Sequence, residues 1–261
     1  PNATDYVMAA IGIGVLFEAA RRTTGYFIPG LASFAILYAL FGQYFMGIFG
    51  HGGFSVERLL YRLFMTSEGI FGITLSTAST AIVVFILFGA FLSVSGATAL
   101  FNDLALAAAG RRRGGPAQVA VISSALTGSL SGSAVANVAT TGTFTIPLMK
   151  SIGLSSRFAG AVEATASTGG MIMPPIMGAA AFIMAGFLGI SYTTIVIAAI
   201  VPALLYYAAL IMAIDLEAKK QGLKGINKEN IPQVRAVLKA RGLLLLPLVI
   251  VIGTLLLGKT P

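Results

Sequence analysis

The chain has 261 residues, of which 57% are hydrophobic and 10% are charged, and its mean hydropathy is +0.91. An average soluble domain carries about 25% charged residues, so this composition excludes a disordered chain and an ordinary soluble enzyme. The 17 lysines and arginines outnumber the 9 aspartates and glutamates. In a membrane protein such an excess marks cytoplasmic loops. We therefore expect no nucleic-acid partner.

The N-terminal part contains two apolar stretches. Residues 6–20 predict a helix that falls short of the roughly 20 residues needed to cross a bilayer. Residues 26–49 are rich in Phe, Leu, Ile and Tyr and would extend about 36 Å as a helix, which predicts a full crossing. Ser55 then caps an amphipathic helix that carries Arg58 and Arg62 and lies in the interface. We therefore assign residues 1–66 to N-terminal scaffold helices and an interfacial arm helix.

The rest of the chain, residues 67–261, alternates spans with two interrupted elements. Residues 73–97 predict a span whose helical pattern continues to Arg111, Arg112 and Arg113. Further spans are expected over 193–214 and 243–257, joined by a basic loop and short amphipathic helix over 215–241.

The interrupted elements lie between these spans. Residues 116–150 are rich in small residues around Gly128–Ser133, and form either one long crossing or a hairpin. Residues 157–190 predict a helix broken at Ser167–Gly170 and again at Pro174 and Pro175, because proline removes a backbone donor and clashes with the preceding turn.

The distribution of charge favours the hairpin. A hairpin puts 14 of the 17 basic residues on one side of the membrane and leaves Arg58, Arg62 and Lys259 on the other, whereas a crossing divides them far more evenly. Basic residues normally collect on the cytoplasmic side. The sequence therefore predicts an all-α polytopic membrane protein with a re-entrant helical hairpin, open to the cytoplasm, and a discontinuous transmembrane helix.

The two breaks indicate an ion site. Unwound backbone survives in a bilayer only where it is buried in protein or lines a wet cavity. Hydroxyl, amide and carbonyl oxygens without a carboxylate cluster suit sodium better than calcium or magnesium. The oxygens at the two breaks belong to Ser131, Ser133 and Asn137 on one side and to Ser167, Thr168, Gly169 and Gly170 on the other. Of these, Ser131, Ser133, Asn137, Thr168 and Gly169 are the predicted sodium ligands.

Other interpretations of these residues remain open. Gly128 and Gly132 form a GxxxG pattern that could serve only close helix packing. Glu163 lies about one turn before the second break and is either a functional group or half of an interfacial ion pair with Arg157. Pro174 and Pro175 are further site candidates.

An enzymatic role is disfavoured by the residues present. The sequence has no cysteine, and its one histidine, His51, falls outside the predicted membrane segments. The run from Gly128 to Gly132 has Leu130 where a G-x-S-x-G nucleophile motif needs serine, and no P-loop motif occurs. We expect a protein that is not an enzyme and needs no cofactor beyond sodium as a coupling ion.

Two long motifs resemble a known transporter family. The run Gly128-Ser-Leu-Ser-Gly-Ser-Ala-Val-Ala-Asn137, continuing through Thr141-Gly142 to Ile146-Pro-Leu-Met149, resembles the first hairpin of the large permease subunit of tripartite ATP-independent periplasmic (TRAP) transporters. Glu163-Ala-Thr-Ala-Ser-Thr-Gly-Gly170 followed by Ile172-Met-Pro-Pro-Ile-Met-Gly178 resembles the same family. The likeness covers residues 70–261, and the N-terminal helices resemble the small-subunit or linking part of fused permeases associated with TAXI binding proteins.

The resemblance implies an elevator-type importer in the bacterial or archaeal inner membrane. It would be driven by a sodium gradient and fed by a periplasmic substrate-binding protein carrying an organic acid. The motif places Ser131, Gly132, Ser133 and Asn137 at the hairpin tip, with Ser167, Thr168, Gly169 and Gly170 completing a sodium site beside the substrate.

The family also has a second, inverted repeat. On this resemblance the chain is the N-terminal portion of such a permease, so that its partners include the remaining half and membrane lipid. The alternatives are a sodium-coupled di- or tricarboxylate carrier without a binding protein and a non-transporting membrane scaffold.

Overall fold

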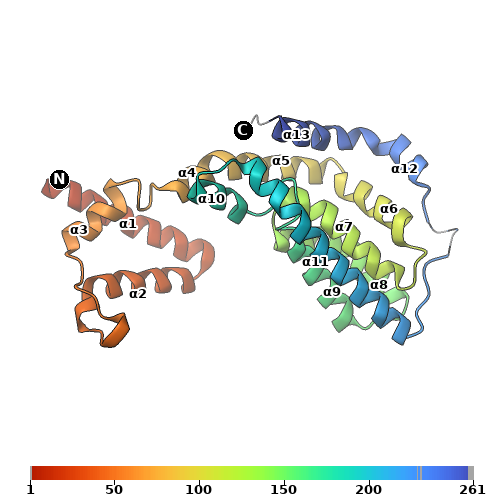
Figure 1. Ribbon diagram of the computed structural model, residues 1–261, viewed down its shortest axis with the longest axis horizontal. Coiled ribbons are helices and arrows are strands. Elements are labelled where there is room, and N and C mark those ends of the chain that lie inside the picture. Colours follow the sequence, from red (N-terminus) through yellow and green to blue (C-terminus); the bar gives the residue numbers. More distant parts are fainter. Residues whose placement is uncertain (1, 228, 230, 258–261) are drawn as a thin grey trace. The chain divides into compact units, whose positions relative to one another are not determined.

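The computed structural model describes residues 2–227, 229 and 231–257, and these are helical throughout apart from turns and linkers (Figure 1). Contacts divide the chain into two compact units that meet between Ser76 and Thr77, whereas the sequence placed a boundary between residues 66 and 67. Lys228 and Lys259, which entered the charge argument, lie outside the described residues. Each unit is considered by itself.

The first helix is longer than predicted. α1 (Ala3–Thr24) has 22 residues and is long and apolar enough to cross a membrane, so the expectation that this stretch falls short is wrong. The helix continues through Arg21 and Arg22 because both guanidinium groups contact the Glu18 carboxylate, at 2.7 and 2.8 Å. The charged residues therefore occupy the last turns of the helix instead of following it.

The second span is shorter than predicted. α2 (Phe27–Phe41) and the 3₁₀ turn η1 (Gly42–Tyr44) together make a candidate span, and the chain then turns through η2 (Gly47–Phe49). Gly47 has a φ of +70°, a left-handed conformation that glycine tolerates, so the predicted helix to residue 49 ends early.

A helix is present where the interfacial arm helix was predicted. Ser55 caps α3 (Val56–Leu60) by accepting a hydrogen bond from the backbone N–H of Arg58 at 3.3 Å, as the sequence predicted. The helix continues into a π-helical turn, η3 (Tyr61–Met65), and both pack against α1.

The second unit contains the remaining helices and three of the five candidate membrane spans among the described residues. The spans are Ile73–Val94, Tyr192–Lys220 and Val234–Leu255. Its elements are α4 (Ile73–Thr77, shared with the first unit), η4 (Ala78–Ile82), α5 (Val83–Val94), α6 (Ala97–Ala109), α7 (Gly115–Ser131), α8 (Ala134–Ser151), α9 (Ser156–Gly169), α10 (Ala179–Leu188), α11 (Tyr192–Lys220), α12 (Val234–Arg241), η6 (Gly242–Leu245) and α13 (Leu246–Leu256).

Two boundaries differ from the prediction. The helical pattern expected to run on to Arg111 is broken at Ser95 and Gly96, because Gly96 has a φ of +97° and separates α5 from α6. α11 continues to Lys220, past the expected end of its span at Ile214. Its last turns keep their apolar contacts, since Ile214 and Ala218 are 2% exposed.

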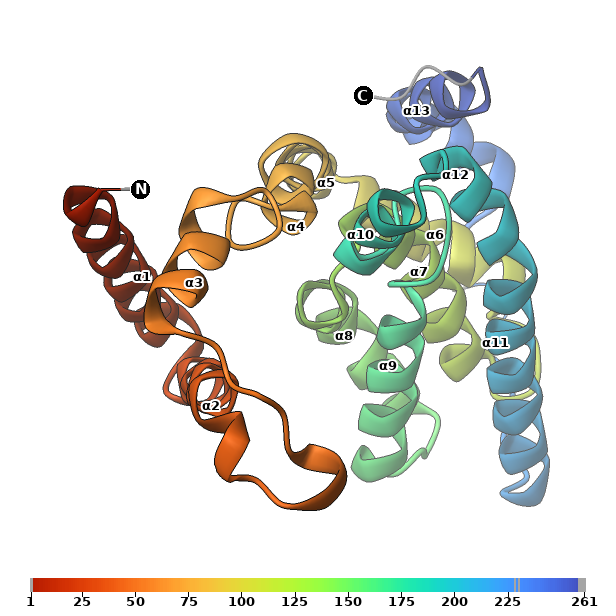
Figure 2. The same ribbon diagram turned by 60° about the vertical axis from the view of Figure 1, so that its left-hand side comes forward.

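The helical hairpin and the broken helix are both confirmed as backbone features. α7 and α8 pack against each other and are joined by a tight turn at Gly132, whose φ is +59°. α9 ends at Gly169, and an unwound linker leads to α10. α9 packs against both hairpin helices, and α11 covers α7 and α9 (Figures 1 and 2).

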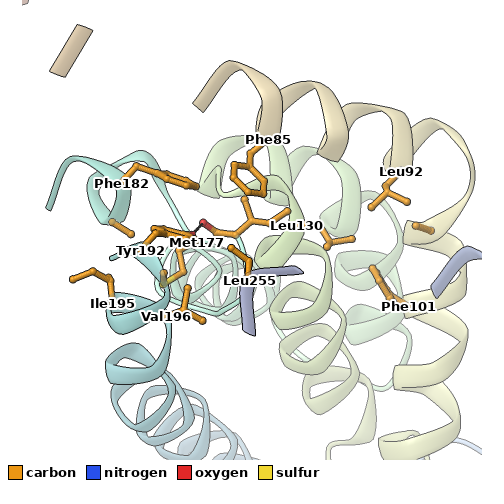
Figure 3. Close-up of a cluster of buried hydrophobic side chains, with 13 residues drawn as sticks. Phe85, Leu92, Phe101, Leu130, Met177, Phe182, Tyr192, Ile195, Val196 and Leu255 are labelled. Carbon is orange, nitrogen blue, oxygen red and sulfur yellow. Dashed lines mark hydrogen bonds between the residues drawn. The ribbon is translucent and has the colours of Figure 1, made fainter. Parts of the chain in front are cut away.

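A hydrophobic cluster closes over the hairpin tip and the linker. It joins Leu130 from the tip and Met177 from the linker to Phe85, Phe182 and Tyr192 from three helices (Figure 3). The rings of Phe182 and Tyr192 are stacked, with centroids 4.2 Å apart. This packing places apolar side chains against the tip and the linker.

Candidate functional site

The hairpin and the break of the discontinuous helix touch through two glycines. A Cβ atom added to Gly128 would lie 2.6 Å from the Cα of Gly170 and 2.8 Å from Nδ2 of Asn137. Real Cβ atoms do not approach so closely, so only glycine permits this backbone contact. The first glycine of the GxxxG pattern therefore brings two predicted site residues, Asn137 and Gly170, together.

The hairpin tip is also joined to the linker. The backbone N–H of Ile176 donates to the carbonyl of Ser129 at 3.1 Å. A Cβ on Gly132 would collide with the carbonyl oxygen of Met177. The hydroxyl of Tyr192 donates to the carbonyls of Pro175, at 3.1 Å, and Ile176. The tip thus satisfies part of the unwound backbone, as a bilayer requires.

Asn137 supplies the buried polar oxygen of the site. Its side chain is fully buried, and Nδ2 donates to the carbonyl of Ser124 at 2.8 Å. Its Oδ1 is one of three buried side-chain atoms in the described part of the chain that have no hydrogen-bond partner. An unpaired buried acceptor costs about 1–3 kcal/mol, and a cation ligated by that oxygen would remove the cost.

The remaining predicted residues lie around this point with different partners. Ser133 caps α8 by accepting from the N–H of Ala136 at 3.3 Å, and Ser131 accepts from the N–H of Ser133 at 3.4 Å. Thr168 is exposed and donates to the carbonyl of Ala164 in its own helix at 2.8 Å.

Three further predicted residues lie at the end of α9 and in the linker. A Cβ on Gly169 would lie 2.5 Å from the Tyr206 ring and 2.9 Å from that of Tyr207, so this glycine admits α11. Pro174 and Pro175 lie in the linker, as the break predicted.

Glu163 does not form the ion pair with Arg157 that was one of its two interpretations. It is fully buried, and none of the described ion pairs joins it to Arg157. Four hydroxyl groups surround its carboxyl oxygens instead, and they come from Ser124, Thr141, Thr145 and Ser167.

The sequence analysis missed three of those four partners. Asn137, Thr141 and Thr145 follow one another at intervals of four residues, and so form one polar stripe along α8. That stripe was a signal in the sequence that could have found Thr141 and Thr145. Ser124 carries no comparable local signal.

Two cavities adjoin the tip from the side of α5. One, of about 380 Å³, is lined by Gly89 and Ser93 of α5 and by Thr127, Ser131 and Ser133 of the hairpin. The other, of about 350 Å³, lies between the tip, α5, α10 and the linker. The tip thus contacts the break of α9 directly, and on the side of α5 the two cavities lie beside a close backbone contact between Gly89 and Leu130.

Comparison with known proteins identifies the family. Residues 11–261 match the family model described as tripartite ATP-independent periplasmic transporter, DctM component. The chain belongs to this family.

Three relatives show how much of a large permease the chain represents. It is 32% identical over 207 residues to the C4-dicarboxylate TRAP transporter large permease protein DctM of Pseudomonas aeruginosa, covering 78% of this chain and 46% of the relative. It is 34% identical over 150 residues to a putative TRAP transporter large permease protein of Haemophilus influenzae, covering 57% and 34%. It is 29% identical over 176 residues to the 2,3-diketo-L-gulonate TRAP transporter large permease protein YiaN of Escherichia coli, covering 66% and 40%. The chain therefore spans less than half the length of these relatives.

Membership settles two predictions. The family consists of transporter permeases, so the expectation that the chain is not an enzyme is confirmed. The chain is a multi-pass protein of the inner membrane, which agrees with its five candidate spans. The TAXI association, the small-subunit-like assignment of residues 1–66 and the sodium ligands stay predictions.

Proposed function

We propose that this chain forms the N-terminal half of a permease that takes up an organic acid together with sodium, with a periplasmic binding protein as donor. The observation that carries the proposal is the contact between the hairpin tip and the break of α9, with Asn137 Oδ1 buried beside it. Family membership supports the uptake role. The relatives' names mention a C4-dicarboxylate and 2,3-diketo-L-gulonate, both organic acids, which supports the substrate class.

The lengths and charges of the hairpin support a re-entrant position. α7 and α8 have 17 and 18 residues and so extend about 26 Å, close to the roughly 30 Å of a hydrocarbon core. Arg113 precedes α7 and Lys150 lies in the last turn of α8, so the open end of the hairpin is basic on both sides. Basic ends favour the cytoplasmic face, with the tip deep in the bilayer.

Sodium fits the chemistry at the tip. α7 ends at Ser131 and α9 at Gly169, so the carbonyl ends of two helices are near Asn137. Helix C-termini carry partial negative charge and attract cations. Amide and carbonyl oxygens hold a monovalent cation weakly enough for release during transport. Asn137 is the best-placed ligand, with Ser131, Ser133, Thr168 and Gly169 completing the proposed set.

The proposal gives roles to the second half of the permease and to the two parts of this chain. The second half of the permease would supply an inverted copy of the hairpin and broken helix, and thereby the rest of the substrate site. Residues 1–66 would act as a static scaffold resembling the small subunit of fused, TAXI-associated permeases. The hairpin and α9 would move together as the transport domain of an elevator.

The test is uptake of labelled organic acids into proteoliposomes that contain the full-length permease. The binding protein and an inward sodium gradient are each present or absent, and the panel includes a C4-dicarboxylate and a sugar acid. Accumulation that requires both additions supports the proposal. Accumulation with sodium alone would instead favour a simple carrier, and no accumulation by a folded sample would favour a scaffold.

A further inference from the structure

The carboxyl group of Glu163 is the centre of a buried polar cluster made by three helices. Its Oε1 accepts hydrogen bonds from Ser124 of α7 at 3.1 Å, Thr141 of α8 at 2.5 Å and Ser167 of α9 at 3.1 Å. Its Oε2 accepts from Thr145 of α8 at 2.5 Å. All five side chains are fully buried. In a low-dielectric interior such bonds are strong, and leaving one unmade is costly.

The cluster leads directly to Asn137. The hydroxyl of Thr141 is 2.7 Å from the Asn137 carbonyl oxygen and 3.1 Å from the hydroxyl of Ser124. The side-chain amide of Asn137 donates to the carbonyl of Ser124. The backbone carbonyl and the side-chain amide nitrogen of Asn137 therefore contact Thr141 and Ser124, two residues that also bond to Glu163. Oδ1 of Asn137 is left without a partner.

The backbone of α8 is shaped to admit this carboxyl group. A Cβ on Gly142 would lie only 3.2 Å from Cγ of Glu163. The absence of a side chain at residue 142 lets α8 and α9 approach with the carboxyl group between them, and so sets the distance from Glu163 to both threonines.

We propose that Glu163 is a positioning residue, which locks the hairpin to α9 and orients Asn137 Oδ1 toward the sodium ion without binding the ion itself. This inference rests on the proposed function only in naming sodium as the ion. It separates the two roles that the predicted site residues combined, with ligands at the tip and a hydrogen-bonded support one to two turns deeper. Supports of this kind typically change metal affinity by about 10- to 100-fold when they are removed.

Three substitutions distinguish support from ligation. Thr145→Val keeps the side-chain shape but removes one hydroxyl from the cluster, and Glu163→Ala removes its centre. Glu163→Gln retains one carboxyl-like oxygen, and its amide can donate to Thr145, whose own proton can go to the Thr141 carbonyl 3.0 Å away. Thr143→Val is the matched control, because Thr143 lies exposed on the same helix.

The experiment uses the full-length permease, with two readouts. One is the sodium concentration that gives half-maximal uptake, compared with the maximal rate. The other is the sodium concentration that gives half of the sodium-induced rise in apparent melting temperature, which needs no transport. We expect Glu163→Ala and Thr145→Val to raise both concentrations about 10-fold with a smaller change in maximal rate. Glu163→Gln should largely restore wild-type values, and Thr143→Val should match them.

The outcomes separate this inference from the proposed function. If sodium stabilises the wild type and Thr145→Val leaves both concentrations unchanged, the positioning role is wrong whatever happens to Glu163→Ala. If Glu163→Gln is as impaired as Glu163→Ala, the carboxylate binds the ion and the positioning role is again wrong. Stabilisation by sodium that follows the expected order, without sodium-dependent uptake, would overturn the proposed function and leave the positioning role standing. A wild type that sodium does not stabilise at all would overturn both.

Discussion

The contact between Gly128 and Gly170 can be tested with a single methyl group. Carbon atoms in contact are normally about 3.5–4.0 Å apart, whereas a Cβ on residue 128 would lie 2.6 Å from the Gly170 Cα. The two backbones would have to separate by about 1 Å more to make room for it. The Gly170 Cα cannot rotate away, because it is a backbone atom. Overpacking of this kind typically costs about 1–3 kcal/mol, and we expect Gly128→Ala to lower the stability of the permease by that amount.

Gly160→Ala is the control for the same chemical change. Gly160 lies in α9, and a Cβ there meets nothing within 4 Å. Replacing a helical glycine by alanine at such a site stabilises a helix by about 0.5–1 kcal/mol. Thermal unfolding of the detergent-solubilised full-length permease would measure both variants. Gly128→Ala should melt below the wild type and Gly160→Ala at or above it; equal melting temperatures for the two variants would refute the close contact.

The other predictions concern the ion, the sidedness and the linker. Asn137→Ala should raise the sodium concentration for half-maximal uptake without loss of membrane insertion, and an unchanged value would remove this ligand. Ser131→Cys, as the sole cysteine of the full-length permease, should react with an impermeant maleimide from the cytoplasmic side; labelling only from outside would invert the proposed topology. Tyr192→Phe keeps the stacked ring but frees two linker carbonyls, so it should lower stability by about 1–3 kcal/mol. Tyr206→Phe, whose hydroxyl contacts a carbonyl within helix α9, should change stability less.

The two breaks could be predicted because their signals are local. A run of small residues around Gly132 and a glycine pair followed by two prolines both interrupt a helix through the backbone itself. The break at Gly96 was missed because one glycine in an apolar run does not by itself end a helix. The length of α1 was missed because Glu18 neutralises two arginines that looked like a boundary.

The support of the candidate site could be predicted only in part because it is assembled from distant residues. Glu163 is separated by 18 to 39 positions from its partners on α7 and α8. Periodicity gives the faces of a single helix but not which faces meet. The sequence could therefore identify Asn137 and Glu163 as candidates, whereas their connection through Thr141 and Ser124 required the packing of three helices.

The hairpin contacts α9 and α5 through different kinds of interaction. Parting α9 from the hairpin would remove the hydrogen bonds that the Glu163 carboxyl group accepts from Ser124, Thr141 and Thr145, and a buried polar group left unsatisfied costs about 1–3 kcal/mol. On the other side, no hydrogen bond joins α5 to the hairpin among the described residues, and two cavities adjoin the contact. Apolar surfaces can shift past one another without leaving polar groups unpaired. If the permease works as proposed, the hydrogen bonds between them make the hairpin and α9 move as one body.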